Sequence, residues 1–353
     1  MADEIGAAVI GAGFGASVHV PGLQHLDGVR VVGIAASSRE SAERAAAQSG
    51  VEAYDDYRRL LDRPDVQLVT VSAPAPLHHE MTLAALERGK HVICEKPFAT
   101  TLEQAEDMLR RAQAAGVVHA IDFEFRYIGV RQQMKALLDE GYVGEPRLFA
   151  ALATGPLRHP KNEVRPWSLT REGMGGPLGA IGVHLMDAAC WLLGDVASVS
   201  ARLDTYFPQR KVTGGGVMQA TCEDSASITL RFRRDAVATI QAAYVTAVPI
   251  QRVELHGDAG SLLAPDSNTL LGAQEGDPLA PLAVESRCLP AGGWSPQGHP
   301  LLAPFAELAG RVVARIRGEQ SGEFPSFEDG VRSVRLVEAV YRSADSRRVV
   351  ELP

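Results

Sequence analysis

Two charged residues, Glu95 and Lys96, and then Pro97 follow directly after the apolar run at residues 91–94. Such a run predicts a buried strand, and open α/β sheets bind ligands beyond the carboxyl ends of their strands. A lysine that is partly desolvated at such a site has its ammonium form disfavoured, which suits proton transfer. We therefore predict that Lys96 is a catalytic proton relay oriented by Glu95. The alternative is an ion pair that only caps the strand.

A glycine-rich turn follows the first apolar run of the chain. Gly11, Gly13 and Ala16 have the G-x-G-x-x-G/A spacing of a dinucleotide-binding turn, with Phe14 and Gly15 between them. Gly11 would permit the tight turn, Gly13 would let the backbone approach a pyrophosphate, and the small Ala16 would let the following helix pack close to the strand. The N–H groups of that helix would face the phosphates. A turn without a ligand is the alternative, but its place as the first connection of a βαβ series favours nucleotide binding.

The end of the second apolar run is where the sequence would select between NAD and NADP. An acidic residue there accepts hydrogen bonds from both ribose hydroxyls of NAD, whereas this chain has Ser37, Ser38 and Arg39, followed by Glu40. Hydroxyl groups and a guanidinium suit a 2′-phosphate. We expect NADP as the preferred cofactor. NAD is the alternative, because Arg39 could be solvated and Glu40 could supply the acid.

Short apolar runs alternate with amphipathic segments from residue 5 to about residue 122. This alternation predicts an α/β domain of the Rossmann type over residues 1–122, a doubly wound parallel sheet with crossover helices. Thr101 and Gln104 have the spacing of a capping box, and Gly116 would end their helix. The runs are residues 7–13, 29–37, 66–74, 90–95 and 117–123, and the helices are expected over 38–48, 78–89 and 101–116.

The pattern changes after residue 123. Residues 226–232, 237–244 and 252–257 alternate apolar and polar side chains, which predicts strands with one apolar face. We predict a substrate-binding α+β domain over 123–353 with a large, mostly antiparallel, open-faced sheet. Helices are expected over 129–141, 182–194, 300–318 and 327–344.

The composition excludes several classes of protein. The 353 residues are 46% hydrophobic and 22% charged, and the net charge of -8 comes without a basic block, so nucleic acid is not expected as a partner. No apolar window is long enough for a membrane span, and no export signal stands at the start. Cys94, Cys190, Cys222 and Cys288 form no CxxC pair, so neither a disulfide framework nor a zinc site is expected. We expect a cytoplasmic protein with reduced thiols.

The motifs together resemble the Gfo/Idh/MocA family (glucose-fructose oxidoreductase, inositol dehydrogenase) over nearly the whole chain. The resemblance rests on the glycine turn, on P-x-x-x-H at 74–78, on residues 84–97 ending in E-K-P, on F-R-Y at 125–127 and on residues 175–187. It implies an NAD(P)-dependent enzyme that moves a hydride between nicotinamide C4 and a hydroxyl or ketone of a sugar, cyclitol or related small polar molecule. It also implies a homodimer or homotetramer built through the second-domain sheet.

The resemblance also carries over individual site residues. Ala73, Pro74 and His78 would lie near the nicotinamide ribose, and Arg126 could reach the nicotinamide or a substrate oxygen. The family pattern D-x-G-x-H-x-x-D is present as Gly182, His184 and Asp187, with Ala180 in place of the first Asp. The resemblance then implies that His184 is the second catalytic residue and that Asp187 lies at the substrate, and no third ligand is spaced to form a metal site. From its place in a polar loop, Trp167 is expected to line the substrate pocket. A core histidine and a surface tryptophan are the alternatives. Because Ala180 removes a carboxylate, two other functions stay open: a net non-redox reaction with retained cofactor, such as glycoside cleavage, or a regulatory protein without catalysis.

Overall fold

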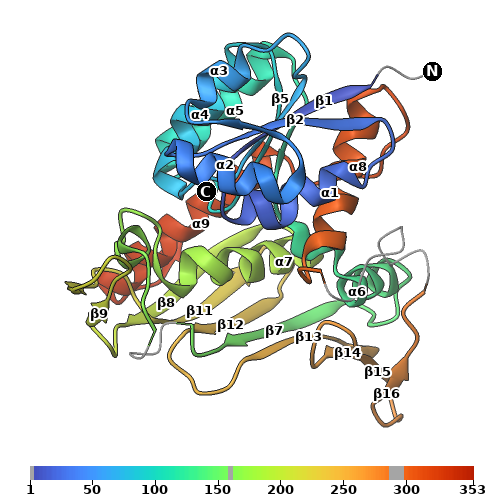
Figure 1. Ribbon diagram of the computed structural model, residues 1–353. Helices are drawn as coiled ribbons and strands as arrows, with labels where there is room; N and C mark the ends of the chain where they lie inside the picture. The colour runs from blue at the N-terminus through green and yellow to red at the C-terminus, as the bar shows by residue number, and fades with distance from the viewer. Residues whose placement is uncertain (1–3, 158–161, 286–297) are drawn as a thin grey trace. The chain divides into compact units, whose positions relative to one another are not determined.

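The computed structural model describes residues 4–157, 162–285 and 298–353, and the chain divides into two compact units (Figure 1). The first unit contains residues 1–127 together with 290–332, and the second contains 128–289 together with 333–353. A single boundary near residue 122 therefore does not describe the chain, although the first crossing lies only five residues later. The segment that returns carries a helix whose apolar side chains, Phe305 and Leu308 among them, are fully buried in the core of the first unit. Burial of this apolar face accounts for the return.

The first unit is built on a six-stranded parallel sheet with the order β3-β2-β1-β4-β5-β6. Strand order reverses at β1, which has β2 on one side and β4 on the other, so the predicted Rossmann sheet is confirmed. The short β3 was missed because its residues are exposed or half-buried and form no apolar run. The strands are β1 (Ile5–Ile10), β2 (Val29–Ala35), β3 (Glu52–Tyr54), β4 (Leu68–Val71), β5 (His91–Cys94) and β6 (His119–Ile121).

Helices connect these strands, and the three predicted ones end within three residues of their expected positions. In the expected capping box, the Thr101 hydroxyl accepts from the Gln104 N–H at 3.2 Å, but the Gln104 side chain accepts from Thr100 instead of Thr101. Gly116 ends this helix in the left-handed conformation, as predicted. The helices are α1 (Val20–Gln24), α2 (Arg39–Ser49), α3 (Tyr57–Leu61), α4 (His78–Leu86), α5 (Leu102–Ala115) and α8 (Leu302–Ile316), with short turns η1 (Gly15–His19), η2 (Ala75–Leu77) and η3 (Glu124–Tyr127).

The second unit contains a nine-stranded sheet with the order β16-β15-β14-β13-β7-β12-β11-β8-β17. Neighbouring strands are antiparallel except for the pair β7 and β12, so the prediction of a large, mostly antiparallel sheet is confirmed. Its strands are β7 (Pro146–Thr154), β8 (Val196–Asp204), β11 (Ser225–Phe232), β12 (Val237–Ala243), β13 (Ile250–Gly257), β14 (Gly260–Ala264), β15 (Leu270–Gln274), β16 (Ala280–Leu282) and β17 (Val350–Glu351), while β9 (Gln209–Lys211) and β10 (Val217–Gln219) form a separate ribbon.

One face of this sheet is covered by helix, and the other presents polar side chains. Helix α7 (Val183–Leu193) is buried along almost its whole length and packs against β7 and β12. In β11, Ala226, Ile228 and Leu230 are buried while Ser227 and Thr229 on the opposite face are exposed. The remaining elements are α6 (Gly129–Asp139), α9 (Phe327–Ser346), η4 (Pro166–Leu169) and η5 (Leu178–Gly182), and the boundary between the two units falls within α9.

Three of the four cysteines lie in the part of the chain that the structure describes. Cys94, Cys190 and Cys222 are buried and form no disulfide bond with one another, and Cys288 lies outside the described residues. Across residues 4–157, 162–285 and 298–353, we find no helix with the length and apolar character that crossing a lipid bilayer requires.

Candidate active site

The glycine turn after β1 has the local geometry of a phosphate-binding turn. Gly11 has a φ of +125°, and a Cβ there would lie 2.2 Å from the carbonyl oxygen of Ser72, so only glycine fits. Gly13 is exposed, and the following turn η1 begins without a side-chain cap. Its first backbone N–H groups have no side-chain acceptor at the helix start, which fits a pyrophosphate at this position.

The first helical turn packs closest to the sheet at Gly15, one residue before the expected Ala16. A Cβ on Gly15 would lie 2.9 Å from Val9 Cγ1, whereas Ala16 is half-buried against the apolar core. Gly15 therefore has the packing role that we predicted for Ala16. Phe14 lies edge-on to the rings of His19 and His299, at centroid distances of 5.6 and 5.4 Å.

The residues expected to select the cofactor lie at the start of α2. Ser37 precedes Ser38, whose hydroxyl caps the helix by accepting from the Ser41 N–H at 3.2 Å. The Arg39 side chain is 60% exposed and donates to Glu43 at 2.6 Å. Because the pair is exposed to solvent and contributes little to stability, Glu43 would not prevent Arg39 from binding a phosphate.

The Glu95–Lys96 pair lies at the carboxyl end of β5, where the sequence predicted it. The Glu95 N–H donates to the carbonyl of Val71 in β4 at 2.8 Å, which extends the strand pairing by one residue. Glu95 is buried, and its Oε2 accepts from the Lys96 backbone N–H at 3.1 Å and lies 3.8 Å from Lys96 Nζ. The Lys96 side chain is 22% exposed. The carboxylate is thus placed to orient a partly exposed ammonium.

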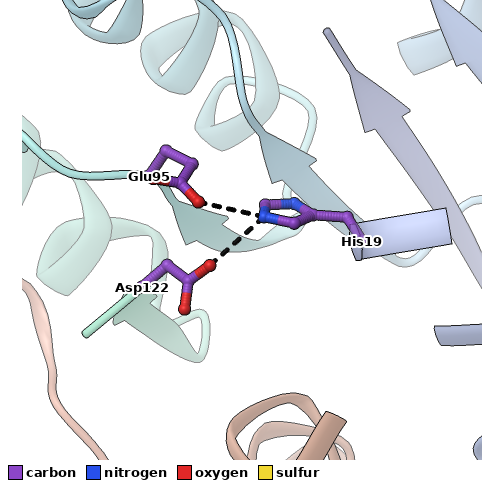
Figure 2. Close-up of side chains that lie close together, drawn as sticks. All are labelled: His19, Glu95 and Asp122. Carbon is purple, nitrogen blue, oxygen red and sulfur yellow. Dashed lines mark hydrogen bonds and ion pairs between the residues drawn. The ribbon is translucent and has the colours of Figure 1, made fainter. Parts of the chain in front are cut away.

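A buried histidine contacts the other oxygen of Glu95, a buried aspartate contacts the same histidine, and sequence reasoning missed both. His19 Nε2 lies 3.1 Å from Glu95 Oε1 and 3.2 Å from Asp122 Oδ2 (Figure 2). His19 comes from η1, Asp122 follows β6, and the His19 ring stacks on Phe305 at 4.1 Å. Asp122 carried the same signal as Glu95, a charge directly after an apolar strand, whereas His19 lies in an apolar segment and reads as a core residue.

The carboxyl groups of this cluster do not share their charge equally. Burial raises the pKa of Asp122 well above its usual range, and the neighbouring charge of Glu95 raises it further. Burial, and then repulsion from Asp122 and Glu95, raise the pKa of Glu124. Burial also opposes ionisation of Glu95, but Lys96 and His19 outweigh it and lower the pKa of Glu95 to about 2. Of the three carboxyl groups, Glu95 therefore ionises first, and Asp122 and Glu124 keep their protons to higher pH.

His78 links the loop after β4 to the turn that carries Lys96. Its Nδ1 lies 2.8 Å from the carbonyl oxygen of Pro97, and its Nε2 lies 2.8 Å from that of Ala73. The ring is buried, which lowers the pKa of His78 although the Ala73 carbonyl favours a protonated ring. Both ring nitrogens thus face backbone oxygens of the two loops. These contacts hold Ala73 and Pro74 beside the turn after Lys96, and a direct bond from His78 to the cofactor stays a prediction.

Arg126, expected to reach the nicotinamide or substrate, pairs within its own unit. It is buried, and its Nη2 donates to Asp329 Oδ1 at 2.9 Å, near the start of α9. This ion pair joins η3 to the returning C-terminal segment, which supplies a structural reason for an arginine at this position. A contact to ligand stays a prediction.

The remaining predicted residues belong to the second unit. His184 and Asp187 are buried on α7, with exposed fractions of 2% and 5%. Ala180 and Gly182 lie in η5, directly before α7, and Trp167 in η4 is 39% exposed. Ala180, Gly182, His184 and Asp187 thus follow one another along two consecutive helical segments. Joint action of His184 with Lys96 stays a prediction.

A Rossmann sheet with an uncapped glycine turn and a charged strand end defines a dinucleotide-binding oxidoreductase, and comparison with known proteins agrees. Residues 5–123 match the oxidoreductase family with an NAD-binding Rossmann fold, Gfo/Idh/MocA, and residues 131–263 match the Gfo/Idh/MocA C-terminal domain. The chain belongs to the Gfo/Idh/MocA family, and the resemblance seen in the sequence is confirmed.

Relatives and solved structures cover nearly the whole chain. The 1,5-anhydro-D-fructose reductase of Ensifer adhaerens is 30% identical over 98% of this chain and 97% of its own. The inositol 2-dehydrogenase of Streptomyces avermitilis is 28% identical over 100% of this chain and 96% of its own. A solved structure of levoglucosan dehydrogenase in complex with NADH and L-sorbose superposes with a TM-score of 0.90 at 25% identity and covers 99% of each chain.

The unequal charge of the cluster predicts an unusual effect of Asp122→Asn on stability. Asp122 is protonated in the folded protein but ionises in the unfolded chain above about pH 4, so the folded state binds more protons and loses stability as the pH rises. Asp122→Asn removes this loss. We expect the urea midpoint of the variant to fall less between pH 5 and pH 8 than that of the natural protein.

Glu95→Gln is the matched control, because Glu95 is charged in the folded protein and its lowered pKa stabilises the fold above about pH 4.5. This variant should have a lower urea midpoint at every pH from 5 to 8. Equal pH slopes for Asp122→Asn and the natural protein would contradict the assignment of the proton to Asp122.

Proposed function

We propose that this protein is an NAD(P)-dependent dehydrogenase or reductase that acts on a hydroxyl or ketone of a sugar, cyclitol or related small polar molecule. The observation that carries the proposal is the Glu95–Lys96 pair at the carboxyl end of β5, in the same parallel sheet whose β1 ends in the glycine turn. The names of the relatives support the substrate class, since they include a sugar-derivative reductase and an inositol dehydrogenase.

The proposed cofactor site uses residues from three strand ends of the first unit. Gly11, Gly13 and the start of η1 would receive the pyrophosphate, and Ser37, Ser38 and Arg39 would receive the adenosine ribose. Ala73 and Pro74 would lie beside the nicotinamide ribose. When bound, the nicotinamide supplies the group that accepts or gives a hydride.

In this proposal Lys96 moves the proton that accompanies the hydride. In oxidation the neutral amine takes the hydroxyl proton as the C–H bond gives its hydride, and the ammonium returns a proton in the reverse reaction. Glu95 orients the amine from 3.8 Å. His184 would hold the same hydroxyl from the second unit, with Asp187 and Trp167 on the substrate. Because Ala180 supplies no carboxylate, proton transfer depends on Lys96 and His184.

Replacement of the proposed relay should remove catalysis and leave the cofactor bound. We expect Lys96→Met to reduce turnover by about 10²–10⁴-fold, because a methionine cannot carry the proton, while NADH and NADPH still bind. The measurement is nicotinamide absorbance with a panel of levoglucosan, myo-inositol, L-sorbose and other sugars, plus fluorescence titration of both dinucleotides.

Lys135→Met is the matched control, because Lys135 pairs with Asp139 on the surface of α6 in the second unit. It should retain full activity. Unchanged turnover of Lys96→Met would refute the relay, and tight dinucleotide binding without turnover of any panel member would favour a regulatory protein.

We further propose that NADP is preferred, on the support of Arg39 and the two serines before it. Arg39→Ala should weaken NADPH binding by about tenfold, since a charge-assisted hydrogen bond is worth about 1.5–3 kcal/mol, and should leave NADH binding nearly unchanged. Fluorescence titration of both dinucleotides measures this. Arg44→Ala is the control, because Arg44 lies on the same helix and pairs with Glu40. Tighter binding of NADH than NADPH by the natural protein would contradict the preference.

We also propose that two or four copies associate through the open face of the nine-stranded sheet. The support is a broad face with exposed side chains from several strands, among them Ser200, Arg202, Ser227, Thr229 and Thr239, with the half-buried Gln241 beside them. Thr229 faces Thr239 across the β11–β12 pair, so a charge at this position would be buried in such an interface.

We expect Thr229→Glu to reduce the molar mass in light scattering to that of one chain. Tyr206→Glu, at a 60% exposed position outside this face, should not change it, and a monomeric natural protein would overturn the proposal.

A further inference from the structure

The two carboxylate oxygens of Glu95 face different groups, and the group on the buried side has no part in the reaction proposed above. Its Oε2 faces the partly exposed Lys96, and its Oε1 faces His19, which is fully buried. One donor atom each from His19, Glu95 and Asp122 lie within 4.8 Å of one another (Figure 2). A buried imidazole is therefore connected to Lys96 through a single carboxylate.

The contacts of the His19 ring indicate where its proton lies. Nε2 faces two carboxyl groups, so a proton there satisfies them. Nδ1 is buried and has no hydrogen-bond partner among the described residues. A proton on Nδ1 would be a buried N–H donor without an acceptor, which is unfavourable. The geometry thus favours a ring that carries its proton on Nε2 and donates it to the cluster.

Several titratable groups of the first unit surround Glu95 and Lys96. The α8 helix contributes the apolar ring of Phe305 against His19, so it adds no charge there. The titratable side chains of the surroundings are His19 from η1, His78 from α4, Cys94 from β5, and Asp122 and Glu124 after β6. Of these, His19 lies 3.1 Å from Glu95 Oε1, and the carboxyl group of Asp122 also hydrogen-bonds to Glu95.

We propose that His19 is a positioning residue for the proton transfer assigned to Lys96, because its Nε2–H holds Glu95 and shares the charge of the carboxylate. This role of His19 rests on the proposed function of Lys96. A carboxylate beside an ammonium favours the charged form, and a second donor on the same carboxylate weakens that effect. His19 therefore makes the neutral amine of Lys96 more accessible near neutral pH. Without His19, Glu95 loses one of the donors that share its charge, so the carboxylate acts more strongly on Lys96.

Two amide replacements of different reach test the role of His19. Gln can place an N–H near the position of Nε2 and rescue the contact to Glu95, whereas Asn is too short to reach it. We expect the pH midpoint for acetylation of Lys96 to rise by about one unit in His19→Asn and to stay near the natural value in His19→Gln. The measurement is trace labelling with acetic anhydride across pH, read by mass spectrometry of the Lys96 peptide, with Lys135 as internal reference.

His79→Asn is the matched control, because it removes an imidazole–carboxylate contact of 3.0 Å, to Asp107, in the same unit. Its Lys96 midpoint should not move. If His19→Asn does not fold, His19→Leu takes its place, since an apolar side chain keeps the packing on Phe305 and also lacks the donor. An unchanged or lowered midpoint in the folded donor-free variant overturns the inference.

Failure of this inference can be told from failure of the proposed function. The labelling midpoint needs no substrate, so it reports on the contact between His19 and Glu95 even if Lys96 is not a relay. Inactive Lys96→Met together with an unmoved midpoint in His19→Asn refutes the role of His19 alone. Active Lys96→Met refutes the relay, and a moved midpoint would then leave His19 as a residue that only tunes a structural ion pair.

Discussion

The buried carboxylate of Glu95 is the constraint on which the candidate site depends. An ionised carboxylate that is shielded from water must be paired, and Glu95 meets this need with Lys96 on one oxygen and His19 on the other. The pairing fixes the turn after β5 and connects η1 and the end of β6 to it. The carboxyl ends of β5 and β6 and the first helical turn are thus tied together by one charge.

A second constraint is the close approach of backbones beneath the glycine turn. The carbonyl of Ser72 occupies the space that a Gly11 side chain would need, and the Gly11 N–H bonds to the carbonyl of Ala35 at 2.8 Å. The ends of β1, β2 and β4 are therefore drawn together. This arrangement explains why the cofactor turn and the loop of Ala73 and Pro74 can serve the same ligand, since small displacements of either would separate them.

Sequence reasoning succeeded where the signal is local along the chain. The E-K-P segment, the glycine turn and the Thr101 cap each lie within a few residues, and the alternation in β11 shows its buried face directly. It failed where partners are distant: His19 meets Asp122 from 103 positions away, and Asp329 reaches Arg126 across a spacing of 203. Neither pairing leaves a periodic pattern in the sequence. The apolar side chains of α8 predict an amphipathic helix, but they do not indicate which unit of the chain buries them. The short β3 has too little apolar surface to be recognised.

The surroundings also explain why a lysine, and not a carboxylate, is suited to exchange protons at this strand end. Glu95 is held ionised with a pKa of about 2, so it is too weak a base near neutral pH, and Asp122 and Glu124 are already protonated and buried. Burial raises the pKa of the Cys94 thiol, and His78 lies between two backbone carbonyls. Lys96 combines partial exposure with a charged neighbour that holds its orientation. The acids around it fix charge, and this arrangement supports the proposal that the amine is the group that exchanges a proton with a ligand.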